Sequence, residues 1–278
     1  MRALRIAAVI GAALMAGAAA SPAARAATES PLPAPGAAAT SSPAATPGAS
    51  VDVETGAAHE SLTNGSPAWD SQFVTVTQRL SPRRVFYGGA EITNRFNQQD
   101  AQFTAGAYVP LSSAWEGYAE TSVSPTHHIL PALSVTAGAQ YGSASHWFEG
   151  LAVRHTEYDV ASVNSGIFSL EHYWGNLRFE YRLTAAQLAG TGTDVEHAFR
   201  LDRYYGESNS FVGLGFAVGR EVENVGLPTL LTSHVEGWSV LGRHAMGRRW
   251  AIVYMLETFQ QGNSYTRTGG RLGLDYRF

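Results

Sequence analysis

The feature that most constrains this chain is a period-two alternation of apolar and polar residues, which begins near Val51 and continues to the C-terminus. The segment "LRFEYRL" at 177–183 alternates strictly, and the last segment, "RLGLDYRF" at 271–278, does much the same. Successive side chains on a β-strand point to opposite faces, so each segment predicts a strand with one apolar and one polar face. Beyond residue 26, no run approaches the roughly 20 apolar residues that a membrane helix needs. The pattern therefore predicts an all-β protein.

Turn motifs such as "NQQD", "WGN" and "QGNS" separate the alternating segments. Counted back from the C-terminus, thirteen strands are predicted near residues 71–80, 84–96, 101–111, 113–124, 129–141, 146–158, 163–174, 176–188, 195–205, 209–220, 232–245, 248–260 and 265–278. Bacterial barrels made of one chain have an even number of strands, so the weaker alternation around Val51 and Val53 is interpreted as a first strand. The prediction is a transmembrane antiparallel up-and-down β-barrel with about 14 strands, and about 12 strands is the alternative.

The connections between the predicted strands fall into two classes by length. If Phe278 lies in the periplasm, the connections on its side are the short turns "SPRR", "LSSA", "GSAS", "WGN", "YGESN" and "MGRR". The other side includes the longer connections "SPTHH", "AGTGTD" and residues 221–231. Outer-membrane barrels have short periplasmic turns and longer extracellular loops. We therefore expect a barrel in a Gram-negative outer membrane, with both the N-terminus and the C-terminus in the periplasm.

The first 50 residues do not share this alternation. A positively charged start and an alanine-rich apolar run precede the cleavage-type sequence "ARA", so residues 1–26 are predicted to be a secretory signal peptide. Residues 27–50 consist mainly of Ala, Pro, Ser, Gly and Thr, which predicts a disordered linker. Residues 51–278 then form the predicted outer-membrane β-barrel.

The alternation also sorts side chains between lipid and lumen. The lipid-facing set is expected to be Leu177, Phe179, Tyr181, Leu183, Val212, Leu214, Phe216, Leu272 and Leu274. The lumen-lining and binding candidates are Arg154, Arg178, Glu180, Arg182, Glu196, Arg200, Asp202, Arg271 and Asp275, together with Arg249 and Glu257. An Arg or Lys on the lipid side near the middle of the bilayer costs about 2–4 kcal/mol, which supports this assignment. Because both signs of charge occur on neighbouring strands, we expect ion pairs in the interior.

Aromatic residues concentrate at the predicted strand ends. An interfacial girdle, rather than a track through the lumen, is predicted for Trp115, Trp147, Trp174, Tyr204, Tyr205 and Trp250. The last strand ends in the apolar row Leu272, Leu274, Tyr276 and Phe278. A terminal Phe that follows a Tyr by two residues resembles the signal read by the outer-membrane assembly machinery. The expected partners are therefore outer-membrane lipids, lipopolysaccharide and the barrel assembly machinery.

Composition and motifs exclude several kinds of chemistry. The chain has no cysteine, which excludes thiolate metal sites, catalytic cysteine and disulfides, and its net charge of −4 gives no indication of a nucleic-acid partner. Neither G-x-S-x-G nor H-E-x-x-H occurs, and no metal or cofactor is predicted. His127-His128 lies in a predicted outer loop, and His155, Glu157 and Asp159 lie near the outer rim. A surface hydrolase that uses these three residues is an alternative, but solvated histidines are the simpler interpretation, so we predict no enzymatic activity.

Four segments resemble the YaiO family of outer-membrane β-barrel proteins, with a similarity that covers roughly residues 51–278 and is most specific in its second half. They are "LAVRHTEYD" (151–159), "LEHYWGNLRFEYRLT" (170–184), "LDRYYGESNSFVGLGFAVGRE" (201–221) and "YTRTGGRLGLDYRF" (265–278). Some relatives carry tetratricopeptide repeats before the barrel and look like parts of polysaccharide secretion systems, whereas this chain has a Pro/Ala-rich linker there. The predicted lumen fits passage or export of a small solute or polysaccharide, and the resemblance adds a periplasmic secretion partner as one option. A structural or surface-interaction barrel with an occluded lumen, using the 221–231 loop, is the alternative.

Overall fold

A computed structural model describes residues 49–143, 146–188, 192–206, 209–225 and 230–278, so the predicted signal peptide and nearly all of the predicted linker lie outside the described residues. The described part contains fourteen strands: β1 (Ser50–Leu62), β2 (Trp69–Ser81), β3 (Arg84–Arg95), β4 (Gln98–Pro110), β5 (Trp115–Val123), β6 (Leu133–Gly142), β7 (Trp147–Glu157), β8 (Ser162–Trp174), β9 (Leu177–Leu188), β10 (Thr193–Tyr205), β11 (Ser210–Glu223), β12 (Leu231–Ala245), β13 (Trp250–Gln261) and β14 (Tyr265–Arg277). Within these ranges, no helix is long and apolar enough to cross a membrane.

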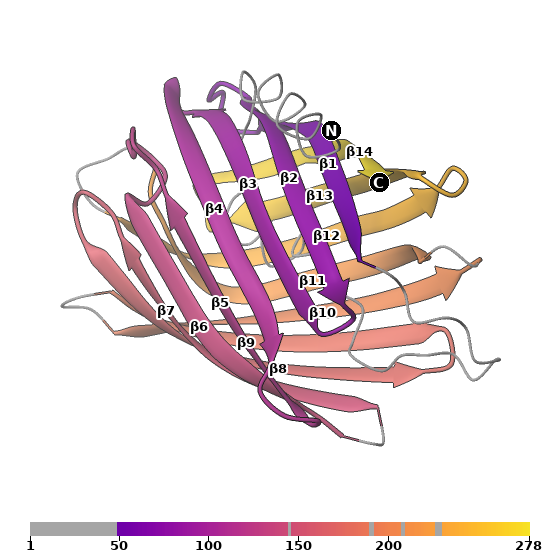
Figure 1. The fold of residues 1–278 in the computed structure, drawn as a ribbon. Coiled ribbons are helices and arrows are strands. Elements are labelled where there is room, and N and C mark those ends of the chain that lie inside the picture. The colour runs from indigo at the N-terminus through magenta and orange to yellow at the C-terminus, as the bar shows by residue number, and fades with distance from the viewer. Residues whose placement is uncertain (1–48, 144–145, 189–191, 207–208, 226–229) are drawn as a thin grey trace.

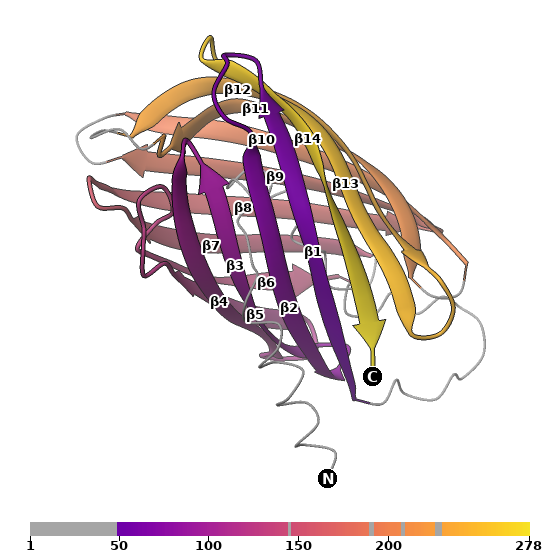
Figure 2. The ribbon, with the colours of Figure 1, turned by 90° about the horizontal axis from the view of Figure 1, so that it is seen from above.

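The strands form one closed antiparallel barrel in which every strand pairs with its neighbours in sequence. Closure is made by β1 and β14, which pair over eleven positions that include Val53 opposite Tyr276. These two strands lie side by side in Figure 2, and the amide of Phe278 donates a hydrogen bond to the carbonyl of Val51 at 2.9 Å. In Figure 1 the near strands β1–β4 cross the far strands β10–β13 at a steep angle, as tilted strands around a closed wall do. The prediction of fourteen strands, including the weak first one, is confirmed.

The barrel has two rims with different connections. The rim at which β1 begins and β14 ends is called the terminal rim, and its six connections contain at most four residues each. The opposite rim is called the distal rim, and it carries the two longest connections, 124–132 and 224–230. The longest connections therefore lie at the predicted end of the barrel, but the connection at "AGTGTD" has only four residues, 189–192, and is no longer than those of the terminal rim.

The outer face of the wall is apolar. Large side chains that point outward include Leu151, Leu214, Leu256 and Leu272, each of which is about 60% exposed or more. Exposed aromatic residues follow the terminal rim on the same outer face, namely Trp115, Tyr141, Trp147, Trp174, Tyr205 and Trp250. An apolar band with an aromatic edge is the surface that a transmembrane barrel presents to lipid.

Tyr204 does not belong to the outer girdle, so that prediction was wrong for this residue. Its ring packs with Phe211, Leu241 and Met255 inside the barrel. The physical reason is strand geometry: side chains two residues apart share a face, and Asp202 points into the lumen. Proximity to a strand end predicted the girdle for both Tyr204 and Tyr205, but only the second points outward.

Candidate functional site

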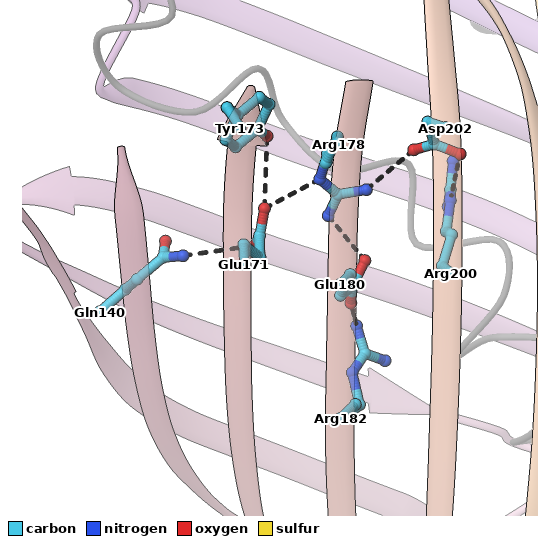
Figure 3. Close-up of polar contacts among 8 residues, drawn as sticks. All are labelled: Gln140, Glu171, Tyr173, Arg178, Glu180, Arg182, Arg200 and Asp202. Carbon is cyan, nitrogen blue, oxygen red and sulfur yellow. Dashed lines mark hydrogen bonds and ion pairs between the residues drawn. The ribbon is translucent and has the colours of Figure 1, made fainter. Parts of the chain in front are cut away.

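Arg178 in β9 is the centre of an ion-pair network on the inner wall (Figure 3). Its guanidinium donates to Glu171 of β8 at 2.9 Å, to Asp202 of β10 at 3.0 Å and to Glu180 of β9 at 2.6 Å. The Arg178 side chain is 1% exposed. Buried charged groups need hydrogen-bonded partners of opposite sign. Here each of the three guanidinium nitrogens donates to a different carboxylate. One side chain therefore ties three neighbouring strands together.

The network extends along the wall in both directions from Arg178. Arg182 donates to the second oxygen of Glu180 at 2.8 Å, and Arg200 donates to the second oxygen of Asp202 at 2.8 Å. The three arginines face three carboxylates, those of Glu171, Glu180 and Asp202, so the formal charges of this group balance. The structure thus places five of the predicted lumen residues in one group.

The other predicted lumen residues are distributed around the interior. Arg271 lies over the ring of Phe73 at 3.5 Å and bonds Glu54 at 3.3 Å. Asp275 accepts a hydrogen bond from Arg243 at 2.7 Å. Glu257 lies 3.6 Å from the buried Arg267. Arg154 donates to the hydroxyl of Thr136 at 3.0 Å. Glu196 lines the chamber described below. Arg249 is the exception: it lies in the exposed turn 246–249 and donates to the hydroxyl of Tyr276, so its assignment to the lumen was wrong.

The connection 124–132 between β5 and β6 folds inward at the distal rim. The carboxylate of Asp100 in β4 accepts the backbone N–H groups of His128 (3.0 Å), Ile129 (2.7 Å) and Leu130 (2.8 Å), and it also bonds the ring of His128 at 2.8 Å. The Asp100 side chain is fully buried. Hydrogen bonds to a charged acceptor contribute more than neutral ones, so this carboxylate is the main anchor of the connection.

This inward connection spans much of the distal mouth. Ile129 and Leu130 are buried, and the side chain of Asn224, just after β11, donates to the carbonyl of His128 at 3.2 Å. Strands β5 and β11 lie nearly opposite each other in the ring of fourteen. A contact between their ends therefore crosses the opening rather than following the wall.

A chamber lies beneath the inward connection, between it and the wall formed by β4–β11. It contains about 1080 Å³ of empty space, part of which is open solvent. Its charged lining includes Arg154, Arg182, Glu120 and Glu196. Hydroxyl groups also line it, those of Ser134, Thr156, Ser165 and Thr184. The chamber thus offers charged groups of both signs and hydroxyls to a solute.

Apolar residues also occupy part of the distal interior. Tyr158, in the connection between β7 and β8, packs with Val163, Leu188 and Val222. Burial raises the pKa of the Tyr158 hydroxyl well above its ordinary value, so the phenol is neutral. The hydroxyl of Tyr265 in β14 donates to Glu223 of β11 at 2.6 Å, which is a second contact between strands that are not neighbours. These contacts narrow the distal half of the lumen.

The residues of the hydrolase hypothesis are not brought together. His155 points outward and its ring bonds the side chain of Asn164 at 2.8 Å, while Asp159 pairs with His127 at 2.9 Å. Glu157 is exposed on the same outer face as His155. Among the described residues, no group of three or more His, Asp or Glu side chains forms a metal site.

Sequence reasoning missed two features of the interior. Asp100 was not singled out, because nothing in the local sequence relates it to a connection 28 to 30 residues away. Tyr87, Tyr108 and Tyr118 point into the lumen near the terminal rim, where their rings lie side by side. The strand alternation carried the signal for the tyrosines, since Tyr118 lies two residues from both Glu116 and Glu120.

A closed antiparallel barrel with an apolar exterior and a charged interior defines the class of outer-membrane β-barrel proteins. The family model "YaiO membrane beta barrel domain" matches residues 51–224, which is more than half of the chain, and the chain therefore belongs to this family. The resemblance inferred from the sequence is thus confirmed for residues 51–224, and the segment 265–278 lies beyond the match. A search of curated proteins finds no matching sequence.

Two solved structures are similar to the whole barrel. One is a "Bacterial polysaccharide outer membrane secretin", with a TM-score of 0.53 and 11% identity over 84% of this chain and 100% of that chain. The other is a "TodX deltaS2S3 mutant monoaromatic hydrocarbon channel", with a TM-score of 0.55 and 7% identity over 84% of this chain and 91% of that chain. At these identities the likeness shows the fold alone.

Proposed function

We propose that this barrel is a narrow, non-enzymatic passage through the outer membrane for a small hydrophilic solute or a polysaccharide. The observation that carries the proposal is the chamber in the distal half of the lumen, where arginine, glutamate and hydroxyl side chains converge beneath an inward connection. A passage of this kind needs polar groups that replace part of the solute's hydration without holding it permanently. The separation of His155 from Asp159 supports a role without catalysis.

The orientation proposed for the passage places the terminal rim in the periplasm and the distal rim outside the cell. Support comes from the connections, since none at the terminal rim exceeds four residues and the longest lie at the distal rim. With this orientation, a solute that leaves the cell meets the terminal half of the lumen first and the anchored connection 124–132 last.

Ion selectivity in planar bilayers tests the passage, with Arg154 as the position to change. Arg154 lines the chamber and donates to the hydroxyl of Thr136. If ions pass this point, Arg154→Gln should raise the ratio of cation to anion permeability by about twofold or more, because a positive charge is removed from the path. Reversal potentials in a salt gradient measure this ratio.

The matched control for that experiment is Arg203→Gln. Arg203 lies opposite Leu177 on the exposed outer face and carries the same charge. Its replacement should leave selectivity unchanged. Equal selectivity of wild type and Arg154→Gln, at measurable conductance, would show that ions do not pass the chamber.

A barrel with an occluded lumen, which acts as a structural or surface-interaction protein, is the second candidate. It is favoured by the distal contacts, in which Tyr158 packs with Val222 and Asn224 reaches His128. The interacting surface would be the segment 221–231, of which residues 226–229 lie outside the described residues. Absence of current both in the wild type and in a variant with a released distal connection would support this candidate over a passage.

We also propose that the C-terminal strand carries an assembly signal in the row Leu272, Leu274, Tyr276 and Phe278. The side chain of Phe278 is exposed, and within the described barrel its ring contacts that of Tyr276 edge to face at 4.8 Å. Deleting Phe278 removes one backbone hydrogen bond to Val51, so the refolded barrel should lose little stability. In cells, however, the amount of inserted barrel should fall several-fold, as measured by heat-modifiable mobility in outer-membrane fractions.

Phe278→Tyr is the control for the deletion, because it keeps an aromatic terminus and should insert normally. Normal insertion of the deletion variant would refute the signal. A refolding defect of equal size in purified protein would instead assign the loss to the sheet.

A further inference from the structure

Three tyrosines form a continuous strip on the inner wall just inside the terminal rim. Tyr87 of β3 and Tyr108 of β4 have ring centroids 6.1 Å apart with an angle of 34° between their planes. Tyr108 and Tyr118 of β5 are 5.4 Å apart with an angle of 21°. The rings of Tyr108 and Tyr118 are therefore stacked, the ring of Tyr87 is tilted against that of Tyr108, and all three side chains are only partly buried. These residues are called the tyrosine strip.

The strip depends on glycines of the neighbouring strands. Gly106 lies opposite Tyr87, and a Cβ atom at Gly106 would overlap the ring of Tyr87. Gly138 lies opposite Tyr118, and a Cβ atom there would lie 2.7 Å from a ring carbon of Tyr118. Glycine thus leaves room for the rings of Tyr87 and Tyr118 to lie against the wall. A ring in this position can present its other face to the lumen.

The charges around the strip are mainly negative. The hydroxyl of Tyr87 donates to Glu120 at 2.8 Å, and Glu116 on the same face of β5 is buried and lies 3.6 Å from Arg83. The arginines of the Arg178 network belong to β9 and β10, on another part of the wall. An anionic solute at the strip would therefore face carboxylates at close range.

We propose that the tyrosine strip is a docking surface for an uncharged oligosaccharide at the terminal mouth of the barrel. The face of a pyranose ring carries C–H groups and packs on an aromatic ring, while its hydroxyls at the edge bond polar neighbours. Tyrosine suits this contact because it combines an apolar face with a polar tip. Three neighbouring rings on adjacent strands, two of them stacked, match consecutive sugar units better than one isolated ring. The inference deepens the proposed function, because it names the solute class for the same lumen.

Equilibrium binding to the refolded barrel in detergent tests the strip without requiring any current. Maltohexaose is the probe, and isothermal titration calorimetry with the full chain gives the dissociation constant. The double variant Tyr108→Leu/Tyr118→Leu keeps apolar volume but removes two rings, so affinity should fall by about tenfold or more. Tyr108→Phe keeps the ring, and its affinity should stay within about twofold of the wild type.

Tyr254→Leu is the matched control, since it lies beside Gly242 on the lipid-facing side of the wall and should bind maltohexaose like the wild type. The unfolding midpoint of each variant in urea, followed by tryptophan fluorescence, separates a lost site from a lost fold. Hexagalacturonate and choline serve as the comparison probes. Both should bind more weakly than maltohexaose, the first because of the carboxylates and the second because it spans only one ring.

Three outcomes would overturn the docking surface: no binding of maltohexaose to the wild type, equal affinity of wild type and the double leucine variant, or preferred binding of choline. The last would make the strip a cation site. Conductance without maltohexaose binding would refute the strip and leave the passage standing. Binding without conductance would retain the strip and refute an open passage.

Discussion

Replacing Arg178 with methionine should lower the free energy of unfolding by about 3–5 kcal/mol. The substitution keeps much of the side-chain volume but removes the guanidinium that bonds Glu171, Glu180 and Asp202. Three carboxylates then remain with fewer partners, and that of Asp202 is fully buried. Removing one member of a buried ion network is costly because the remaining charges stay desolvated. Urea titration of the barrel in detergent micelles, followed by tryptophan fluorescence, measures the difference.

Arg220→Met is the matched control for Arg178→Met. Arg220 pairs with Asp194 at 2.7 Å, but its side chain is 56% exposed, so the change should cost about 0–1 kcal/mol. Arg178→Lys should fall between the two, because an ammonium group cannot reproduce the planar fork of arginine. A loss below about 1 kcal/mol for Arg178→Met would mean that the network does not hold β8, β9 and β10 together.

Replacing Asp100 with alanine should release the connection 124–132 and raise the single-channel conductance several-fold. The variant loses the acceptor of three backbone N–H groups and of the His128 ring. These donors must then form hydrogen bonds with water, and water reaches them only if the connection leaves its buried position. Recordings of the refolded barrel in planar bilayers measure the conductance of wild type and variant under the same salt conditions.

Asp159→Ala is the control for this experiment. Asp159 is exposed and bonds only one side chain of the same connection, that of His127, so its removal should change conductance little. Asp100→Asn keeps one carbonyl acceptor and should give an intermediate conductance. If Asp100→Ala conducts no better than the wild type, the connection does not limit the passage.

The strand pattern and the barrel were predictable because strand alternation is local. The face of each residue in β9 follows from its neighbours, which is why Arg178, Glu180 and Arg182 were assigned to one side from the sequence. The first strand has weak alternation and was predicted because bacterial barrels made of one chain have an even number of strands. Its pairing with β14 along eleven positions supports that reasoning.

The two errors have different causes. Tyr204 was assigned from its proximity to a strand end, whereas Arg249 was assigned by extending the alternation one residue beyond Trp250, where β13 begins. The structure places the first inside, against Phe211, and the second outside, on Tyr276. For Tyr204, counting by twos from Asp202 gives the correct face.

The sequence by itself determined the class of fold, a count of about fourteen strands, the end of the barrel with the longest connections and, apart from Arg249, the lumen side of the charged residues assigned to it, because all of these depend on period two and on turn residues. Only the tertiary structure decided which charges meet, how the tyrosine strip aligns and where the connection 124–132 lies. Those features depend on the register between strands and on contacts across the ring, such as Asn224 with His128. Contacts between residues far apart in the chain leave no periodic pattern in the sequence. Which side chains meet in the interior is therefore decided only when the barrel closes.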